Sequence, residues 1–385
     1  MQERAYKQCD KLMLTILNYA QALVYTLMDL MPSKYQQKSL RALLGLFLEA
    51  TGQSLPQHSQ TVSASAISRF LNHYQWSVRA VIRVVRAEIV RQVKAERGLG
   101  RRPILTVILD MTALEKIGTF SGLGKLIRVY NGKRGLHLLV LYILVGKSRV
   151  PWGFRVYRGK GELAPIKLGQ RLLKTLPKTL TAHYEIRILG DSAFGSIEML
   201  KWVKKQPRTS GIFGIRSDRR LASGSHVSQG TTRGQQVVLQ GLNFPVTLSW
   251  YWLKRDDGSL EKRFVISTKP LSAVYITRLG RRRWQIEGFF KTVKHRFGLH
   301  RFGQSTLLGV YRWLVLSFIA YFLAFWAYLA SGKTTLPDWA DAAKKARETL
   351  LASLVVLGLL INIDRTQSLA RQQGFDITVS GWQYG

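Results

Sequence analysis

The chain has 385 residues, enough for two or three folded units with sizeable cores. Its 46% hydrophobic and 11% aromatic content excludes a chain that is mainly disordered. The 58 Lys and Arg residues against 22 Asp and Glu give a net charge of +36, which predicts a polyanionic partner, with nucleic acid the first candidate. A single cysteine, Cys9, excludes an internal disulfide framework and a CxxC zinc site. Because the N-terminus is polar and carries no secretory signal, we expect a cytoplasmic protein.

Residues 1–100 carry apolar residues at helical spacing and no strand alternation, which predicts an all-helical domain. Within it, residues 63–76 begin with serine caps and place apolar residues on one face of a helix. The helix expected next, over 77–96, adds a row of basic residues. This pair is either a helix-turn-helix-like DNA reader or an ordinary helix pair with a solvated basic face.

A Gly/Pro/Arg linker over 98–103 separates this domain from segments with the pattern of buried strands. Strands are expected at 104–109, 135–145, 152–157, 184–189 and 212–215, and helices at 165–176 and 196–205. Asp110 directly follows the first strand, and Asp191 lies just after the fourth. The order βββαβαβ predicts a ribonuclease-H-like core of the α/β (α+β) class, because a doubly wound nucleotide fold would alternate strand and helix from the start.

Residues 217–270 return to strand-type sequence, which predicts a β-rich insertion between the two parts of the core, 101–216 and 271–304. Strands are expected there at 235–239, 245–253 and 263–268. The second part of the core is predicted to be a helix that runs from Ser272 past Lys294.

Residues 305–385 are predicted to form a C-terminal helical region that completes the core or supports dimerisation. The apolar stretch 313–330 fits either a helix buried on all sides or a marginal membrane span. We favour the buried helix, because a membrane protein with one span would not need basic residues in every other segment. Residues 350–361 are too short to span a membrane and are expected to form another core helix.

Acidic residues are scarce, and Glu287 is the only one between Glu261 and Asp338. On a helix, Arg283, Glu287 and Lys294 would lie on one face. A carboxylate among cations is either a structural ion pair that lowers local repulsion or a metal ligand flanked by cations that hold a phosphate.

Asp110 and Asp191 each follow an apolar strand, and the carboxyl edge of parallel strands is where sites form in α/β sheets. Each aspartate alone could be a turn or helix cap. Together with Glu287, they could converge and hold two hard divalent cations, Mg²⁺ with Mn²⁺ as an expected substitute. Two such ions activate a water or a 3′-hydroxyl in phosphodiester displacement.

The spacing around Glu287 carries a family resemblance. Arg283, three residues, Glu287, six residues and Lys294, within RWQIEGFFKTVK, closely resemble the Tyr-(2)-Arg-(3)-Glu-(6)-Lys signature of the insertion-sequence-4 family of DDE transposases. The position of the family tyrosine holds Gly280 here, and the nearest tyrosine is Tyr275.

Asp110 and Asp191, the latter in ILGDSAFGS, look like the first two catalytic aspartates of that family, and the similarity covers about residues 103–300. The resemblance implies that Asp110, Asp191 and Glu287 ligate two Mg²⁺ ions. It also implies hydrolysis at the ends of an insertion sequence, followed by strand transfer into target DNA. The chain would then be a nucleoid-associated bacterial protein.

The resemblance further implies double-stranded DNA as the partner, both terminal inverted repeats and target, with a homodimer in the synaptic complex and no membrane. The helical domain would recognise the repeats. Expected phosphate contacts are Arg283, Lys294, Lys291, Arg216 and Arg219, although a charge run can also be a solvated face. Trp250 and Trp252 alternate along one expected strand, so they share a face and are either base-stacking candidates or core of the insertion.

Two other functions stay open from the sequence. A structure-specific nuclease on the same fold would use the three acids and cut without joining strands. A non-catalytic DNA-binding protein would merely pair these acids with arginines.

Overall fold

The computed structural model describes residues 2–96, 103–116, 123–124, 126–230, 232–255, 257–333 and 337–378, with side chains from residue 16 onward. The predicted linker, apart from Pro103, lies outside the described residues. The chain divides into two compact units. Unit 1 comprises Met1–Val85 with Thr292–Gly385, and unit 2 comprises Arg86–Lys291.

Unit 1 is helical, and α10 lies at its centre. Its helices are α1 (Gln2–Asp29), α2 (Lys34–Leu48), α3 (Ala64–Asn72), α10 (Leu307–Ala330), α11 (Trp339–Leu350) and α12 (Ala352–Gln372). Helix α10 contacts α1, α2, α3 and α11, which explains why it is apolar on every side.

Helix α10 is long and apolar enough to cross a membrane, with a mean hydropathy of 1.9 over an 18-residue window that is 89% buried in the structure. Among the described residues it is the one single helix that passes this test, and α11 with α12, bent by 94°, passes only as a pair. Buried Arg312 of α10 donates to the carbonyl oxygens of Phe70, Leu71, Tyr74 and Trp76, which fixes α10 to the end of α3. The arrangement of α10 is that of the predicted core helix.

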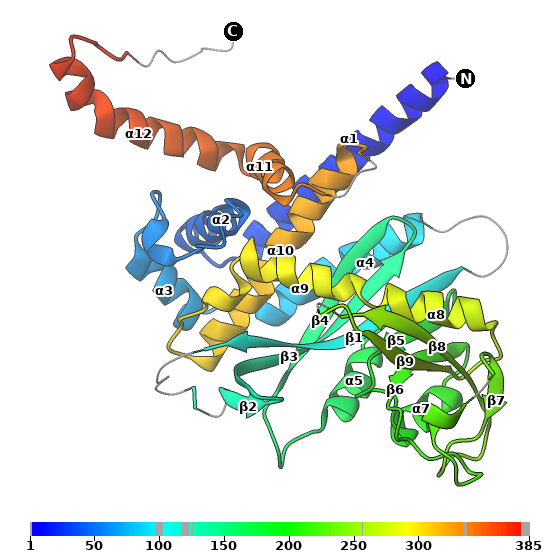
Figure 1. Ribbon diagram of the computed structural model, residues 1–385. Helices are drawn as coiled ribbons and strands as arrows, with labels where there is room; N and C mark the ends of the chain where they lie inside the picture. The colour runs from blue at the N-terminus through cyan, green and yellow to red at the C-terminus, as the bar shows by residue number, and fades with distance from the viewer. Residues whose placement is uncertain are drawn as a thin grey trace. The chain divides into compact units, whose positions relative to one another are not determined.

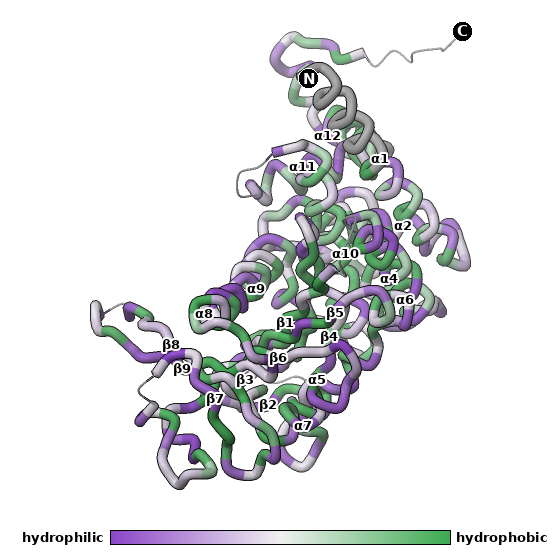
Figure 2. Tube along the Cα trace, turned by 90° about the vertical axis from the view of Figure 1, so that its right-hand side faces the viewer, coloured by the Kyte–Doolittle hydropathy of each residue, from purple (hydrophilic) through white to green (hydrophobic). Residues whose placement is uncertain are grey.

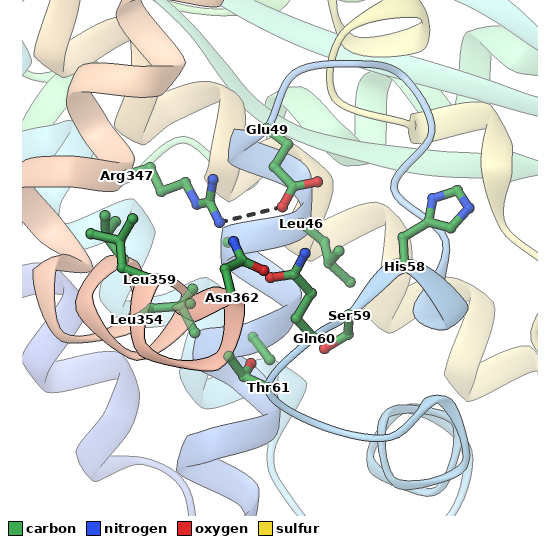
Figure 3. A pocket seen from close by; sticks show the side chains of 14 residues that line it. Leu46, Glu49, His58, Ser59, Gln60, Thr61, Arg347, Leu354, Leu359 and Asn362 are labelled. Atoms are coloured by element: carbon green, nitrogen blue, oxygen red, sulfur yellow. Dashed lines mark ion pairs between the residues drawn. The ribbon is translucent and has the colours of Figure 1, made fainter. Parts of the chain in front are cut away.

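The prediction for residues 350–361 is wrong in part. Leu350, Leu351 and Leu354 are buried, but most apolar residues further along α12 are exposed, so α12 is not buried in a core along its length. Figure 3 shows Leu354 and Leu359 of α12 at a cavity of about 240 Å³, where Arg347 and Glu49 form an ion pair of 3.4 Å.

Unit 2 is built around one mixed sheet. Its strands are β1 (Ile104–Glu115), β2 (Arg128–Tyr130), β3 (Lys133–Val145), β4 (Ser148–Tyr157), β5 (Glu185–Gly190), β6 (Thr209–Ile215), β7 (Gln235–Val237), β8 (Val246–Lys254) and β9 (Leu260–Ser267). Its helices are α5 (Pro165–Leu173), α6 (Lys178–Thr181), α7 (Ile197–Lys205) and α8 (Ala273–Arg282). Helices α4 (Val78–Ala95) and α9 (Gln285–His295) each belong partly to unit 1.

The sheet order is β2-β3-β1-β5-β6-β9-β8-β7, and β4 pairs with β3. Strands β1, β5 and β6 are parallel, and the others pair antiparallel. Within unit 2, Figure 1 shows α8 and α9 on one face of the sheet and α5 and α7 on the other. The central strands are largely apolar in Figure 2, as expected for a sheet covered on both faces. The predicted fold class, a ribonuclease-H-like α/β core with flanking helices, is confirmed.

Two boundaries near the acidic residues differ from prediction. Strand β1 continues five residues beyond Asp110, because its antiparallel pairing with β3 runs on to Glu115 and Gly135. The helix expected over Glu287 is interrupted at Arg283 and Trp284. Backbone hydrogen bonds there join residues three positions apart, and the helix divides into α8 and α9. In addition, the strands of the predicted insertion continue the central sheet through the pairing of β9 with β6.

Candidate active site

Two neighbouring parallel strands bring Asp110 and Asp191 together. Leu109 of β1 is in register with Gly190 of β5, and the residue that follows each of them is an aspartate. Adjacent strands lie about 4.8 Å apart. The chain turns directly after Gly190, where a Cβ atom would approach Phe194 Cβ to 2.9 Å, so only glycine fits this close approach.

Backbone amides orient both aspartate carboxylates. Met111 N donates to Asp110 Oδ1 at 2.8 Å, and Ala193 N donates to Asp191 Oδ1 at 3.0 Å. Asp110 is buried within β1, whereas Asp191 lies in the turn after β5. Each carboxylate is therefore held by its own local backbone.

The third acid, Glu287, comes from the first turn of α9, and Arg283 connects it to β1. Arg283 Nη1 donates to Asp110 Oδ2, while its Nη2 donates to Glu287 Oε1 at 3.2 Å. The Arg283 side chain is only 15% exposed, and this largely buried guanidinium bridges the sheet and the helix. Arg283 thus links Asp110 to Glu287, and the negative charge of Asp191 acts on the carboxyl groups of both.

Burial dominates the electrostatics of these carboxyl groups. Burial raises the pKa of Asp110 to about 7; the Arg283 guanidinium opposes this rise, and the negative charges of Asp191 and Glu287 add to it. Burial also raises the pKa of Asp191 and of Glu287, again against the effect of Arg283. Three carboxylates beside one guanidinium leave two uncompensated negative charges when all are ionised.

This donor set fits hard divalent cations, which take carboxylate oxygen and would neutralise the excess charge. Among the described residues, no group of three or more His, Cys, Asp or Glu side chains lies together as a ready metal site. The Arg283 guanidinium lies between Asp110 and Glu287. Asp110, Asp191 and Glu287 are the residues that could hold such ions.

The raised pKa of Asp110 predicts how the stability of the metal-free protein depends on pH. An aspartate in an unfolded chain has a pKa of about 3.9. Because folded Asp110 binds its proton more tightly, its contribution to stability is full below pH 4 and is lost as the pH rises through about 7. Melting temperatures in EDTA between pH 5 and 8 should fall more steeply for the wild type than for Asp110→Asn. A flatter wild-type curve would contradict this assignment.

A cavity of about 450 Å³ opens beside Asp191. It is lined by cationic and aromatic residues, among them Arg216, Tyr251, Lys262, Arg263, Arg283 and Trp284. Gly280, at the position of the family tyrosine, lets α8 pack closely on the sheet, because a Cβ there would lie 3.0 Å from Val265 and 3.5 Å from Tyr251. Tyr251 and Arg263 were not predicted as site residues. The sequence offered one indication of them, since Tyr251 lies between two tryptophans and Arg263 follows a lysine.

The two predicted base-stacking tryptophans differ in exposure. Trp250 is only 9% exposed, and the Lys262 ammonium lies 4.2 Å from its ring centre, so it is a core residue of the β8–β9 pair. Trp252 is 55% exposed. Side chains alternate along β8, so both tryptophans lie on the opposite face from Tyr251, which lines the cavity beside Asp191. Trp250 therefore offers little surface for a base.

The predicted phosphate contacts have different surroundings. Arg216 is exposed and pairs with Asp218 at 2.6 Å; Arg219 is half-buried, and both line a cavity of about 530 Å³. Lys291 is exposed on α9, one turn after Glu287. Lys294 follows on the same face of this helix, in the part that belongs to unit 1.

Comparisons with known proteins bear on this site. Residues 102–323 match the family described as "Transposase DDE domain". No curated protein sequence matches the chain. The chain is also similar to the protein in "Cryo-EM structure of piggyBac transposase synaptic complex with hairpin DNA (SNHP)", with 15% identity over 91% of this chain and 81% of that chain and a TM-score of 0.49.

Proposed function

The chain belongs to the transposase DDE domain family and is thus an enzyme of DNA cleavage and strand transfer, and we propose that it mobilises an insertion sequence. In this proposal it cuts DNA at the element ends and joins the freed 3′-hydroxyls to target DNA. One observation carries the proposal: Arg283 pairs with Asp110 of β1 and Glu287 of α9, and its charge also acts on Asp191 in the turn after β5.

DDE transposases generally use divalent metal, and we propose that Asp110, Asp191 and Glu287 hold two Mg²⁺ ions, with Mn²⁺ as a substitute. When bound, such ions activate the attacking oxygen and stabilise the leaving oxygen in phosphodiester displacement. The chain itself supplies oriented carboxylates, since the amides of Met111 and Ala193 fix two of them. Burial in unit 2 limits water around Asp110, which strengthens its interaction with any cation.

Arg283 is proposed to hold a DNA phosphate near the cut. A guanidinium that binds two carboxylates has the same fork of donors that binds phosphate oxygens. The spacing of Arg283, Glu287 and Lys294 also supports the finer assignment to the insertion-sequence-4 group, although Gly280 replaces the tyrosine of that signature.

Double-stranded DNA is the partner that the net charge of +36 favours. We propose phosphate contacts from Arg216, Arg219, Lys291 and Lys294, and a base-stacking role for exposed Trp252. Since two element ends must be joined, we propose a homodimer in the synaptic complex, with the N-terminal helices recognising the inverted repeats.

A strand-transfer assay tests this function against its alternatives. A labelled DNA end from the flanks of the source element is incubated with the protein, supercoiled plasmid and Mg²⁺. We expect cleavage and joined products, both abolished by EDTA and restored by Mg²⁺ or Mn²⁺. Cleavage without joining would indicate a structure-specific nuclease. Binding without either reaction would indicate a non-catalytic DNA-binding protein.

A further inference from the structure

A second group of cationic side chains lies on the face of the sheet that α8 covers. Arg149 of β4, Leu144 of β3, Thr106 of β1 and Arg187 of β5 form one row across the sheet, each in register with the next. Directly paired residues point to the same face of a sheet. Arg149 and Arg187, at the two ends of this row, therefore point to the same face.

Helix α8 adds three polar side chains above this row. Tyr275, Arg278 and Arg282 are spaced i, i+3 and i+7, which places them on one stripe of the helix. Arg187 Nη1 donates to the Tyr275 hydroxyl at 2.6 Å, and its guanidinium carbon lies 5.2 Å from the tyrosine ring centre. Figure 2 shows α8 change from apolar at its start to strongly hydrophilic at its arginine-rich end.

Arg187 is buried without a carboxylate partner among the described residues. Its residue is 6% exposed, and its Nε finds no hydrogen-bond acceptor there. The nearest acid along β5, Glu185, pairs with Lys269 at 2.7 Å. A buried charge normally has an oppositely charged partner, because removing it from water is costly.

The arginines also affect one another. Burial lowers the pKa of the Arg282 guanidinium, and the positive charges of Arg149, Arg278 and Arg187 lower it further, against the opposing effect of Tyr275. Arg278 is exposed and Arg282 is half-buried, so the group is open to solvent. An anion would satisfy the buried donor and relieve the repulsion.

We propose that Arg149, Arg187, Arg278 and Arg282, with the Tyr275 hydroxyl, form a phosphate site that holds the DNA backbone away from the cut. This inference rests on the proposed function. Arg187 precedes Asp191 by four residues of β5 and its turn, a distance of about 13 Å. The proposal places the duplex along β5; since DNA rises about 3.4 Å per base pair, the bound phosphate would then lie about four base pairs from the scissile one.

The salt dependence of DNA binding tests this site without requiring catalysis. For the double variant Arg278→Ala/Arg282→Ala, the plot of log affinity against log salt concentration should become shallower by about 1 to 2, since each lost phosphate contact removes about 0.9 from the slope. The matched control is Arg171→Ala, an exposed arginine of α5 on the other face, and should keep the wild-type slope. An unchanged slope in the double variant overturns the proposal.

A methylphosphonate scan locates the contact on the wild-type protein. Neutralising the phosphate about four base pairs from the cut should weaken wild-type binding and leave the double variant unaffected. If no position in that region weakens wild-type binding, the proposal fails, even where the double variant does not fold. If inorganic phosphate alone stabilises the wild type through these arginines while the DNA slope stays unchanged, the site is one for free anions and the DNA assignment is wrong. If the wild-type protein gave no strand transfer in the assay described above but showed the salt slope and the methylphosphonate effect predicted here, the proposed function would be refuted and the phosphate site would stand.

Discussion

Asp191→Asn is expected to reduce cleavage at the element ends by roughly 10³-fold or more, about 4 kcal/mol of transition-state stabilisation. The substitution keeps the shape of the side chain but removes the charge of a proposed metal ligand at the end of β5. Affinity for DNA at moderate salt should stay the same or rise, because a negative charge near phosphate is lost. Single-turnover cleavage and equilibrium binding of the same labelled end measure the two quantities.

Asp218→Asn is the matched control for this variant. Asp218 also lines the cavity beside Asp191, but it is exposed, and its carboxylate pairs with exposed Arg216. We expect near wild-type cleavage from it. Full cleavage by Asp191→Asn would show that the catalytic assignment is wrong.

Arg283→Gln is expected to lower the free energy of unfolding of the metal-free protein by about 3 kcal/mol, because it leaves buried Asp110 without its cationic partner. Glu287 loses the same partner. Bound divalent cations would replace the missing positive charge, so Mn²⁺ should recover most of the lost stability. Urea unfolding in EDTA and in Mn²⁺ provides the comparison.

Arg281→Gln serves as the control, since Arg281 lies 5.1 Å from the Tyr251 ring and forms no described carboxylate pair. It should change stability little in either buffer. Equal loss of stability for both variants, or no recovery of Arg283→Gln with Mn²⁺, would mean that Arg283 does not neutralise the proposed metal ligands.

The sequence was sufficient to predict the strands that carry Asp110 and Asp191, because the signals for them are local. Apolar runs before Asp110 and Asp191 marked two strands, which pair in parallel in the sheet, and the isolation of Glu287 among cations marked it as a candidate third ligand. The end of β1 could not be predicted, since its last five residues are held by pairing with β3. The ion pair of Arg283 with Asp110 depends on a contact across 173 positions, which no local pattern contains.

Burial was harder to predict than secondary structure. Leu357 and Leu360 of α12 look like core residues in the sequence but are exposed. Trp250 and Trp252 were expected to share one face of a strand, and both are paired with β9, yet Trp250 is buried and Trp252 is exposed. The arginine group around Arg187 was not predicted, because its members come from three separate elements.

Manganese anomalous diffraction from crystals grown with Mn²⁺ and a DNA end shows directly whether the three acids hold divalent metal. We predict anomalous peaks at the carboxylates of Asp110, Asp191 and Glu287, with the scissile phosphate beside them. Manganese bound elsewhere, or Glu287 turned away from both aspartates in the DNA complex, would contradict the account.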